Sequence, residues 1–261
     1  MHSVAAVRFS SGRAADEQCL VAAEQVVTFM VEDVGNFTIM CTPTELKALA
    51  VGFAFTEGLI EGVDDVLAIA QSSASPDVVG LKLENPPPGK DGRNLIVSSS
   101  CGICGGRNVE KLLKPLPAGK DQLSISSAGL IELLQEMQRR QHLFTETGGA
   151  HAAAIFTPDG EIAAFAEDIG RHNALDKAIG LGLLNHAPLA GCGVMLSGRV
   201  SFELIAKAAR AGLELVAGAS APTSLAIEAA ERTRITLCAF VRENRATAFT
   251  HPHRIKDGEE G

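Results

Sequence analysis

Two cysteines at a CxxC spacing, Cys101 and Cys104, are the residues whose type and spacing most directly suggest chemistry. The residues before them, 94–98, predict a strand, and a predicted helix follows Gly105 and Gly106. Two thiols at this spacing can bind a metal ion, exchange electrons as a dithiol, or carry a sulfur atom as a persulfide. The function of the chain depends on which of these three chemistries applies.

A structural zinc site is the least favoured of the three. Such a site normally needs a second pair of ligands close in the sequence. No histidine stands at a familiar zinc spacing from the pair. The other cysteines are isolated from one another in the sequence; they are Cys19, Cys41, Cys192 and Cys238. We therefore expect no metal ion to be held by this chain.

A thiol–disulfide oxidoreductase and a sulfur carrier both remain open on the residues alone. A strand, a CGxC sequence and then a helix resemble the local arrangement of thioredoxin, where a helix N-terminus lowers the thiolate pKa. The serines and glycines around Cys101 instead suit a loop that reaches a donor and an acceptor in turn. Spacing does not decide between these two.

Composition limits the broad class of the protein. The 261 residues carry a net charge of −8, which argues against non-specific nucleic-acid binding. No apolar stretch is long enough to cross a membrane, and the first residues lack the pattern of a secretion signal. Isolated cysteines in apolar surroundings suit a reducing compartment. We expect a cytoplasmic protein with no nucleic-acid or membrane partner.

The first half of the chain, residues 1–120, predicts a smaller α+β domain. Residues 25–32 and 37–41 predict a hairpin, with a turn at 34–36. A helix is expected to begin at Thr42, with Pro43 in its first turn and Glu45 closing a capping box. The segment from Lys114 to Asp121 is rich in proline and glycine and is the predicted boundary.

The second half, residues 121–261, alternates helices with strands. Such alternation predicts a layered α/β domain with a largely parallel sheet. The expected helices are 128–142, 173–184, 202–211 and 225–232, and the expected strands are 152–156, 162–166, 193–196, 215–217, 236–241 and 247–249.

Polar residues gather where three predicted strands give way to helices. Residues 167–173 include Asp168, Arg171 and His172, residues 197–201 include Gly198 and Arg199, and residues 219–224 add small hydroxyls. Open α/β sheets bind ligands at such strand ends, and a glycine beside an arginine suits a phosphate. The alternative is that these residues are ordinary helix caps and surface charges.

The sequence also allows predictions for the roles or exposure of three other polar residues: His151, Asp176 and Lys177. His151 opens a predicted strand and, like His172, is either a general base or a hydrogen-bonded structural residue. Asp176 and Lys177 are expected on the exposed face of their helix.

Several ordered motifs together resemble the formate dehydrogenase accessory sulfurtransferase family (FdhD) over nearly the whole chain. Their order makes the match far more specific than one CxxC. The matching segments are residues 56–60, 100–105, 147–151, 167–177, 197–199, 221–224 and 250–252.

The resemblance implies a sulfurtransferase that takes sulfur from a cysteine desulfurase. Its acceptor would be a molybdenum or tungsten bis-molybdopterin guanine dinucleotide, which is then inserted into formate dehydrogenase. In that family the first cysteine of the CGxCG motif is the persulfide carrier, which places the role on Cys101 with Cys104 as its partner. The resemblance also implies a cytidine-deaminase-like, three-layer α/β/α second domain that binds GDP-like guanine nucleotides.

Two further expectations follow from the family resemblance. The deaminase zinc ligands are missing, because no Pro-Cys-x-x-Cys occurs in the second half, so deamination is not expected. A homodimer would match the two guanine arms of the substrate by symmetry. A short C-terminal stretch is also linked to cofactor binding, and here it comprises Phe249, Thr250, His251, Pro252, His253 and Arg254.

Overall fold

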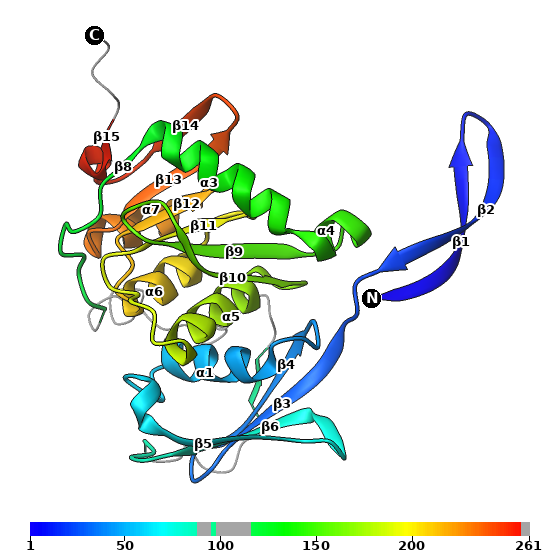
Figure 1. Cartoon of the computed structure of the whole chain (residues 1–261), viewed down its shortest axis with the longest axis horizontal. Coiled ribbons are helices and arrows are strands. Elements are labelled where there is room, and N and C mark those ends of the chain that lie inside the picture. The colour runs from blue at the N-terminus through cyan, green and yellow to red at the C-terminus, as the bar shows by residue number, and fades with distance from the viewer. Residues whose placement is uncertain (88–94, 98–115, 257–261) are drawn as a thin grey trace.

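Two sheets, one in each half of the chain, organise the protein. The computed structural model describes residues 1–87, 95–97 and 116–256 (Figure 1). A five-stranded sheet of order β5-β6-β3-β4-β7 lies in the first half, and a six-stranded sheet of order β10-β9-β11-β12-β13-β14 lies in the second. The division into two domains at residue 120 stays a prediction.

The predicted first hairpin is confirmed by β3 (Gln25–Val31) and β4 (Gly35–Cys41), which pair antiparallel. Alternate side chains of β3, such as Phe29, are buried under α1 (Leu46–Thr56), while Met30 faces outward. This is the period-two pattern of a sheet with one covered face. The sheet is completed by β5 (Val66–Ser72), β6 (Ser75–Leu83) and β7 (Leu95–Val97).

The predicted start of α1 was wrong. The helix begins at Leu46, its N-cap is Glu45 in a left-handed conformation, and no side chain caps it. Thr42 cannot serve as the cap because its polar groups are used elsewhere. Its amide donates to Asp168 Oδ2 at 3.0 Å, and its hydroxyl accepts from the amide of Ile169 at 3.2 Å. Tertiary contacts therefore override the capping signal.

The second sheet is mixed, so the expectation of a largely parallel sheet was wrong. Within it, the parallel pairs are β11 (Gly193–Leu196) with β12 (Leu215–Gly218), and β12 with β13 (Thr236–Arg242). The hairpin of β9 (His151–Phe156) and β10 (Ile162–Asp168), and the edge strand β14 (Arg245–Ala248), pair antiparallel. Short hairpin turns at both edges produce this arrangement.

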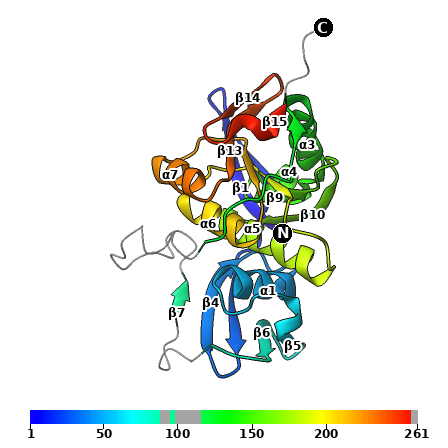
Figure 2. The ribbon, with the colours of Figure 1, turned by 90° about the vertical axis from the view of Figure 1, so that its left-hand side faces the viewer.

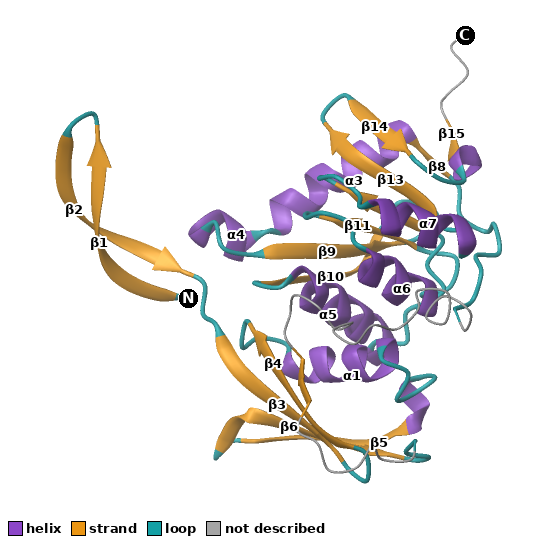
Figure 3. Ribbon diagram, turned by 180° about the vertical axis from the view of Figure 1, so that it is seen from behind, coloured by secondary structure: helices purple, strands orange, loops and turns teal. Residues whose placement is uncertain are grey.

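Helices cover both faces of the six-stranded sheet (Figure 3). Met195 and Leu215 pack in the same core as α3 (Ser127–Arg140), whereas Val194 and Val216 pack with the helices of the other face. Those helices are α5 (Arg171–Leu184), α6 (Phe202–Arg210) and α7 (Ser224–Arg232). The layered α/β prediction is confirmed in this coarse form, and the closer likeness to cytidine deaminases stays a prediction.

The two halves meet where α1 crosses α5, and Figure 2 shows α1 between the five-stranded sheet and α5. Glycines allow this crossing at backbone distance. A Cβ on Gly52 would lie 1.8 Å from the carbonyl oxygen of Asp176, and one on Gly180 would lie 1.9 Å from that of Ala48. Beside the crossing, Lys207 of α6 pairs with Asp176 at 2.8 Å. The contact fixes the first sheet relative to the second.

The first twenty-one residues form a hairpin that the sequence patterns did not predict. Strands β1 (His2–Ser10) and β2 (Arg13–Val21) pair antiparallel around Ser11 and Gly12, both with positive φ. The hairpin extends away from the rest of the molecule (Figure 1). Most of its side chains are exposed, so no alternation between a core face and a solvent face marks it in the sequence.

The substitution Gly180→Ala should lower the free energy of unfolding by about 1–3 kcal/mol, because the added methyl group forces α1 and α5 apart. Alanine is the better helix former, so propensity alone would raise stability. Urea unfolding measures the change. The control is Gly62→Ala, where an added Cβ has nothing within 4 Å and the expected change is below about 0.5 kcal/mol. A Gly180→Ala protein as stable as the wild type would contradict the backbone contact.

Candidate functional site

Cys101 and Cys104 lie outside the described residues, so their predicted chemistry stays a prediction. The three buried cysteines that the structure describes are poor candidates. Burial raises the pKa of the Cys41 thiol to about 12, that of Cys238 to about 11, and also raises that of Cys192. A thiol that stays protonated at neutral pH is a weak nucleophile.

The strand that leads toward the cysteines is anchored beside the other predicted site. β7 pairs parallel with β4, and its last residue, Val97, lies opposite Ile39. Three residues beyond Ile39, Thr42 bonds to Asp168 at the end of β10. Parallel strands end at the same edge of a sheet. The chain therefore leaves β7 on the side of the molecule where β4 meets the β10–α5 junction.

The three predicted junctions lie at one edge of the six-stranded sheet. β10 and β11 both pair antiparallel with β9, and β12 runs parallel to β11, so all three end on the same side. Hydrogen bonds join two of the junctions: Val200 donates to Ala221 O at 3.1 Å, and Thr223 donates to Val200 O at 3.0 Å. Such an edge, with helix N-termini beside it, is where α/β proteins bind anions.

Two arginines from different junctions act on one histidine at this edge. His151 is the first residue of β9, and its Nδ1 would lie 3.0 Å from a Cβ on Gly198. The same Cβ would lie 3.8 Å from Arg171 Cδ. Burial lowers the pKa of His151, the charges of Arg171 and Arg199 lower it further, and Asp168 acts in the opposite direction. We call Arg171, Arg199, Gly198 and His151 the anion site.

One atom of the anion site lacks an internal partner. The Nε of Arg171 is buried and has no hydrogen-bond partner among the described residues. A buried donor that is left unpaired is costly, and a ligand that accepts its hydrogen bond removes the cost. A phosphate oxygen is the acceptor that a guanidinium and a nearby glycine backbone suit best. The arrangement fits a phosphate-bearing ligand.

His172 lies between the starts of two helices beside the anion site. Its Nε2 is 3.4 Å from the hydroxyl of Ser201 and 3.9 Å from Glu203 Oε2 on α6. These contacts orient the ring across the gap between α5 and α6. Direct contact between His172 and a ligand stays a prediction.

Asp168 is bonded within the protein, and its contact with a cofactor stays a prediction. Its side chain is fully buried and forms a 2.8 Å ion pair with Lys177 Nζ. The carboxylate also accepts hydrogen bonds from Thr42 N, Gly170 N and Asn173 Nδ2, at 3.0, 2.8 and 3.0 Å. All these donors lie within the protein. Asp168 therefore holds the turn that presents Arg171.

The expectation that Asp176 and Lys177 are exposed was also wrong. Both are buried, because α1 covers the side of α5 that faces away from the six-stranded sheet. The composition of the helix around these two residues indicates their burial. The residues around them are small or apolar on every side of the helix, which is typical of a helix buried all round; they are Ala174, Leu175, Ala178, Ile179, Gly180 and Gly182.

The C-terminal stretch lies at the opposite edge of the sheet from the anion site. Thr250 bonds to Leu237 N and Ile235 O, at 2.9 and 2.7 Å, and so sits where β13 begins. Phe249 contacts the third junction indirectly, because its ring is 6.2 Å from that of Phe240, whose amide donates to Ser220 O. The structure thus separates most of this stretch from Arg171 and Arg199.

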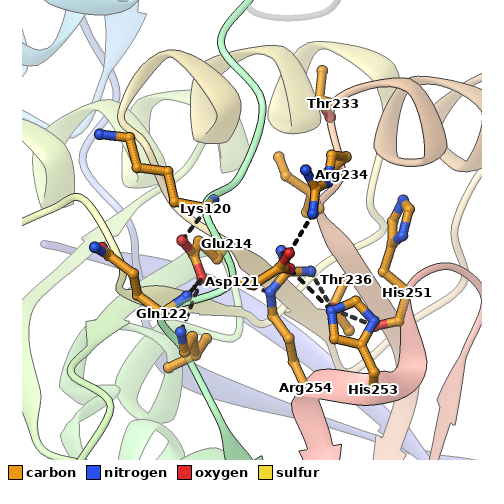
Figure 4. A network of polar contacts seen from close by, with 12 residues as sticks. Lys120, Asp121, Gln122, Glu214, Thr233, Arg234, Thr236, His251, His253 and Arg254 are labelled. Carbon is orange, nitrogen blue, oxygen red and sulfur yellow. Dashed lines mark hydrogen bonds and ion pairs between the residues drawn. The ribbon is translucent and has the colours of Figure 1, made fainter.

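Residues 250–254 form part of a polar network around Arg254 (Figure 4). Arg254 is buried, pairs with Asp121 and lies 3.5 Å from Glu214 Oε2. His253 pairs with Asp121 at 3.0 Å, and the carbonyl of His251 accepts from Thr236 at 2.6 Å. These contacts hold the C-terminal stretch in place. A cofactor contact by His251, Pro252 or His253 stays a prediction.

Glu214 was not singled out in the sequence, yet it is central to this network. Its carboxylate accepts hydrogen bonds from the amides of Lys120, Gln122 and Leu123, at 2.9, 2.7 and 2.9 Å. These are among the first described residues after the segment that carries the cysteines. Glu214 and Arg254 therefore hold residues 120–123 against the six-stranded sheet.

The substitution Lys177→Met should lower the free energy of unfolding by about 3–5 kcal/mol, because Asp168 would then carry a buried charge without its cation. In the double variant Asp168→Asn, Lys177→Met the loss should be smaller than the sum of the two single losses. Urea unfolding of all three variants measures this coupling. The control is Lys47→Met on the exposed side of α1, expected to change stability by less than about 0.5 kcal/mol. Strict additivity would contradict the pairing.

The described residues contain neither a membrane-spanning helix nor a cluster of metal-binding side chains. No described helix is long and apolar enough to cross a membrane. Within the same residues, no group of three or more His, Cys, Asp or Glu side chains is placed to hold a metal ion.

Known proteins are similar to this chain over nearly its whole length. The chain is 37% identical over 253 residues to the sulfur carrier protein FdhD of Saccharolobus solfataricus, covering 95% of this chain and 96% of that protein. It is 35% identical over 256 residues to the sulfur carrier protein FdhD of Xanthomonas axonopodis pv. citri, covering 96% of this chain and 91% of that protein.

A solved structure shares the fold. It comes from Desulfotalea psychrophila, is described provisionally as a formate dehydrogenase accessory protein, and superposes with a TM-score of 0.79 at 23% identity over 98% of this chain and 99% of that one. The sequence profile of the FdhD/NarQ family matches residues 22–256. The motifs, the fold and the relatives agree, and the chain belongs to the FdhD/NarQ family.

Proposed function

We propose that this protein is a sulfurtransferase that carries persulfide sulfur on Cys101. The sulfur comes from a cysteine desulfurase and goes to a molybdenum or tungsten bis-molybdopterin guanine dinucleotide, a substrate destined for formate dehydrogenase. Support comes from the relatives named sulfur carrier protein FdhD and from the accessory-protein description of the similar structure. The proposed site of action is the cytoplasm.

The observation that carries the proposal is the position of the anion site relative to β7. Arg171 and His151 both lie beside Gly198 where β10 and β11 end, and the charge of the exposed Arg199 also lowers the pKa of His151. The Arg171 Nε there is buried and has no hydrogen-bond partner among the described residues. The chain leaves β7 toward Cys101 on the same side of the molecule. A substrate held by its pyrophosphate at the anion site would therefore lie on the side from which the cysteine segment departs.

The proposed first step conserves electrons. The Cys101 thiolate attacks the outer sulfur of a desulfurase persulfide, a new S–S bond forms on Cys101, and the desulfurase cysteine leaves as a thiolate. Cys101 is oxidised to the persulfide level while the desulfurase persulfide is reduced to a thiolate, so no outside oxidant or reductant is needed. Cys104 is the proposed partner in the relay that follows. The buried cysteines described above have pKa values too high for such an attack at neutral pH.

The substrate has two guanine arms, and a homodimer offers two equivalent anion sites related by a two-fold axis. GDP-like nucleotides would occupy the same sites as partial mimics. Two other functions would keep parts of this arrangement: a thiol–disulfide oxidoreductase needs the CxxC without the anion site, and a non-catalytic chaperone needs the anion site without Cys101. The relatives named above give the oxidoreductase no support.

Incubation with a cysteine desulfurase and ³⁵S-labelled cysteine should label the wild-type protein and leave the Cys101→Ala protein with at most about a tenth of that label, since the carrier thiolate is gone. Protein-bound sulfur is measured after separation without reductant. Cys19→Ser, which removes the partly exposed cysteine of β2, is the matched control and should label fully. Equal labelling of wild type and Cys101→Ala would reject the persulfide assignment.

Arg171→Ala or Arg199→Ala should weaken GDP binding by roughly 10- to 100-fold, the cost of losing one charge-assisted hydrogen-bond donor. Isothermal titration calorimetry of the folded proteins measures the affinity. Arg139→Ala, which removes an exposed side chain of α3 that pairs with Glu136, should bind GDP as the wild type does. Unchanged affinity in both anion-site variants would show that the nucleotide binds elsewhere.

A further inference from the structure

His151 is held at the edge of the six-stranded sheet by its strand and by the missing side chain of a neighbour. It is the first residue of β9 and lies opposite Asp168 of β10 in the pairing register. A Cβ on Gly198 would lie 3.0 Å from His151 Nδ1 and 3.2 Å from its Cε1, so the glycine makes room for the ring. His151 is half-buried, which leaves part of it open to a ligand.

The unpaired donor of Arg171 lies beside this ring. The Cβ added to Gly198 would also lie 3.8 Å from Arg171 Cδ, the atom that is bonded to Nε. That Nε is buried and has no hydrogen-bond partner among the described residues. A phosphate oxygen that accepts its hydrogen bond would therefore bind close to His151.

Ser197 can serve the His151 ring in either protonation state. The Ser197 Oγ accepts from the amide of Ala152 at 2.8 Å and lies 3.5 Å from His151 Nδ1. The hydroxyl keeps one hydrogen to donate to a neutral ring and one lone pair to accept from a protonated ring. A proton can therefore be added to His151 without leaving the hydroxyl of Ser197 unpaired.

The charges around His151 favour the neutral ring until an anion binds. Burial lowers the pKa of His151, and the charge of Arg171 on α5 lowers it further. Asp168 on β10 raises this pKa, although its own charge is already paired with Lys177 at 2.8 Å, and Arg199 after β11 lowers it again. A bound anion adds negative charge beside both arginines, so it favours the imidazolium.

We propose that His151 is a ligand-binding residue of the anion site and takes up a proton when the pyrophosphate of the substrate binds there. The imidazolium then becomes a third cationic donor beside Arg171 and Arg199. This inference rests on the anion site of the proposed function and adds one residue and one proton to it.

NMR of the wild-type protein tests the proton uptake. GDP-mannose is the probe, because both of its phosphates are esterified and neither titrates near neutral pH. The ¹³Cε1 resonance of His151, identified by its loss in His151→Gln, should show a pKa that rises when the probe binds. His186, which is exposed beyond the far end of α5, is the internal control, and its titration curve should be the same with and without the probe.

The affinity for GDP-mannose should depend on pH for the same reason. Because the complex holds the proton more tightly than the free protein, the wild type should bind the probe at least about 5-fold more tightly at pH 6 than at pH 8. In His151→Gln, whose side chain is polar but cannot titrate, this ratio should fall below about 2-fold. His186→Gln is the matched control and should keep the wild-type ratio. Isothermal titration calorimetry measures all three proteins.

The outcomes separate this inference from the proposed function. A His151 pKa that GDP-mannose leaves unchanged would overturn the inference alone, and so would a pH dependence that persists in His151→Gln, which would assign the proton to another group such as His172. Binding that is unchanged in both Arg171→Ala and Arg199→Ala would overturn the anion site and the inference together. A wild-type protein that does not bind GDP-mannose at either pH would do the same.

Discussion

The buried ion pair of Asp168 and Lys177 is the constraint on which the site depends. Burying two charges is costly, and the cost is offset only if each charge has several partners. Here Asp168 gathers donors from Thr42, Gly170 and Asn173, and Lys177 also donates to the carbonyl of Thr42 at 3.0 Å. One pair thereby joins the end of β4, the end of β10 and the body of α5.

That junction gives the molecule its functional geometry. Gly170 and Arg171 come two and three residues after Asp168, so the turn that Asp168 holds also sets where the Arg171 backbone lies. On the other side, β4 carries β7, the strand that leads toward Cys101. The glycine crossing of α1 and α5 and the Lys207–Asp176 pair hold the two halves in this relation. The strand that precedes the cysteines in the chain and the turn that carries Arg171 are thus linked to one buried carboxylate.

Periodicity and turn chemistry predicted most strands and helices, because these follow local rules. The mixed order of the second sheet was not predicted, since pairing direction is decided by which edges the hairpins occupy. The α1 start at Thr42 and the exposure of Lys177 failed for one reason: both residues are recruited by Asp168, more than 100 positions from Thr42 in the chain. The position of Arg171 and Arg199 at strand ends singled them out in the sequence, and their contact with a ligand stays a prediction, whereas Glu214 lay in no recognisable motif.

The central claim is that the guanine nucleotide part of the substrate binds where β10 and β11 end. A crystal structure of the protein with GDP tests it most directly. The account predicts phosphate oxygens within about 3 Å of Arg171 Nε and of the Arg199 guanidinium. A nucleotide bound instead at the opposite edge of the sheet, among His251, His253 and Asp121, would contradict it.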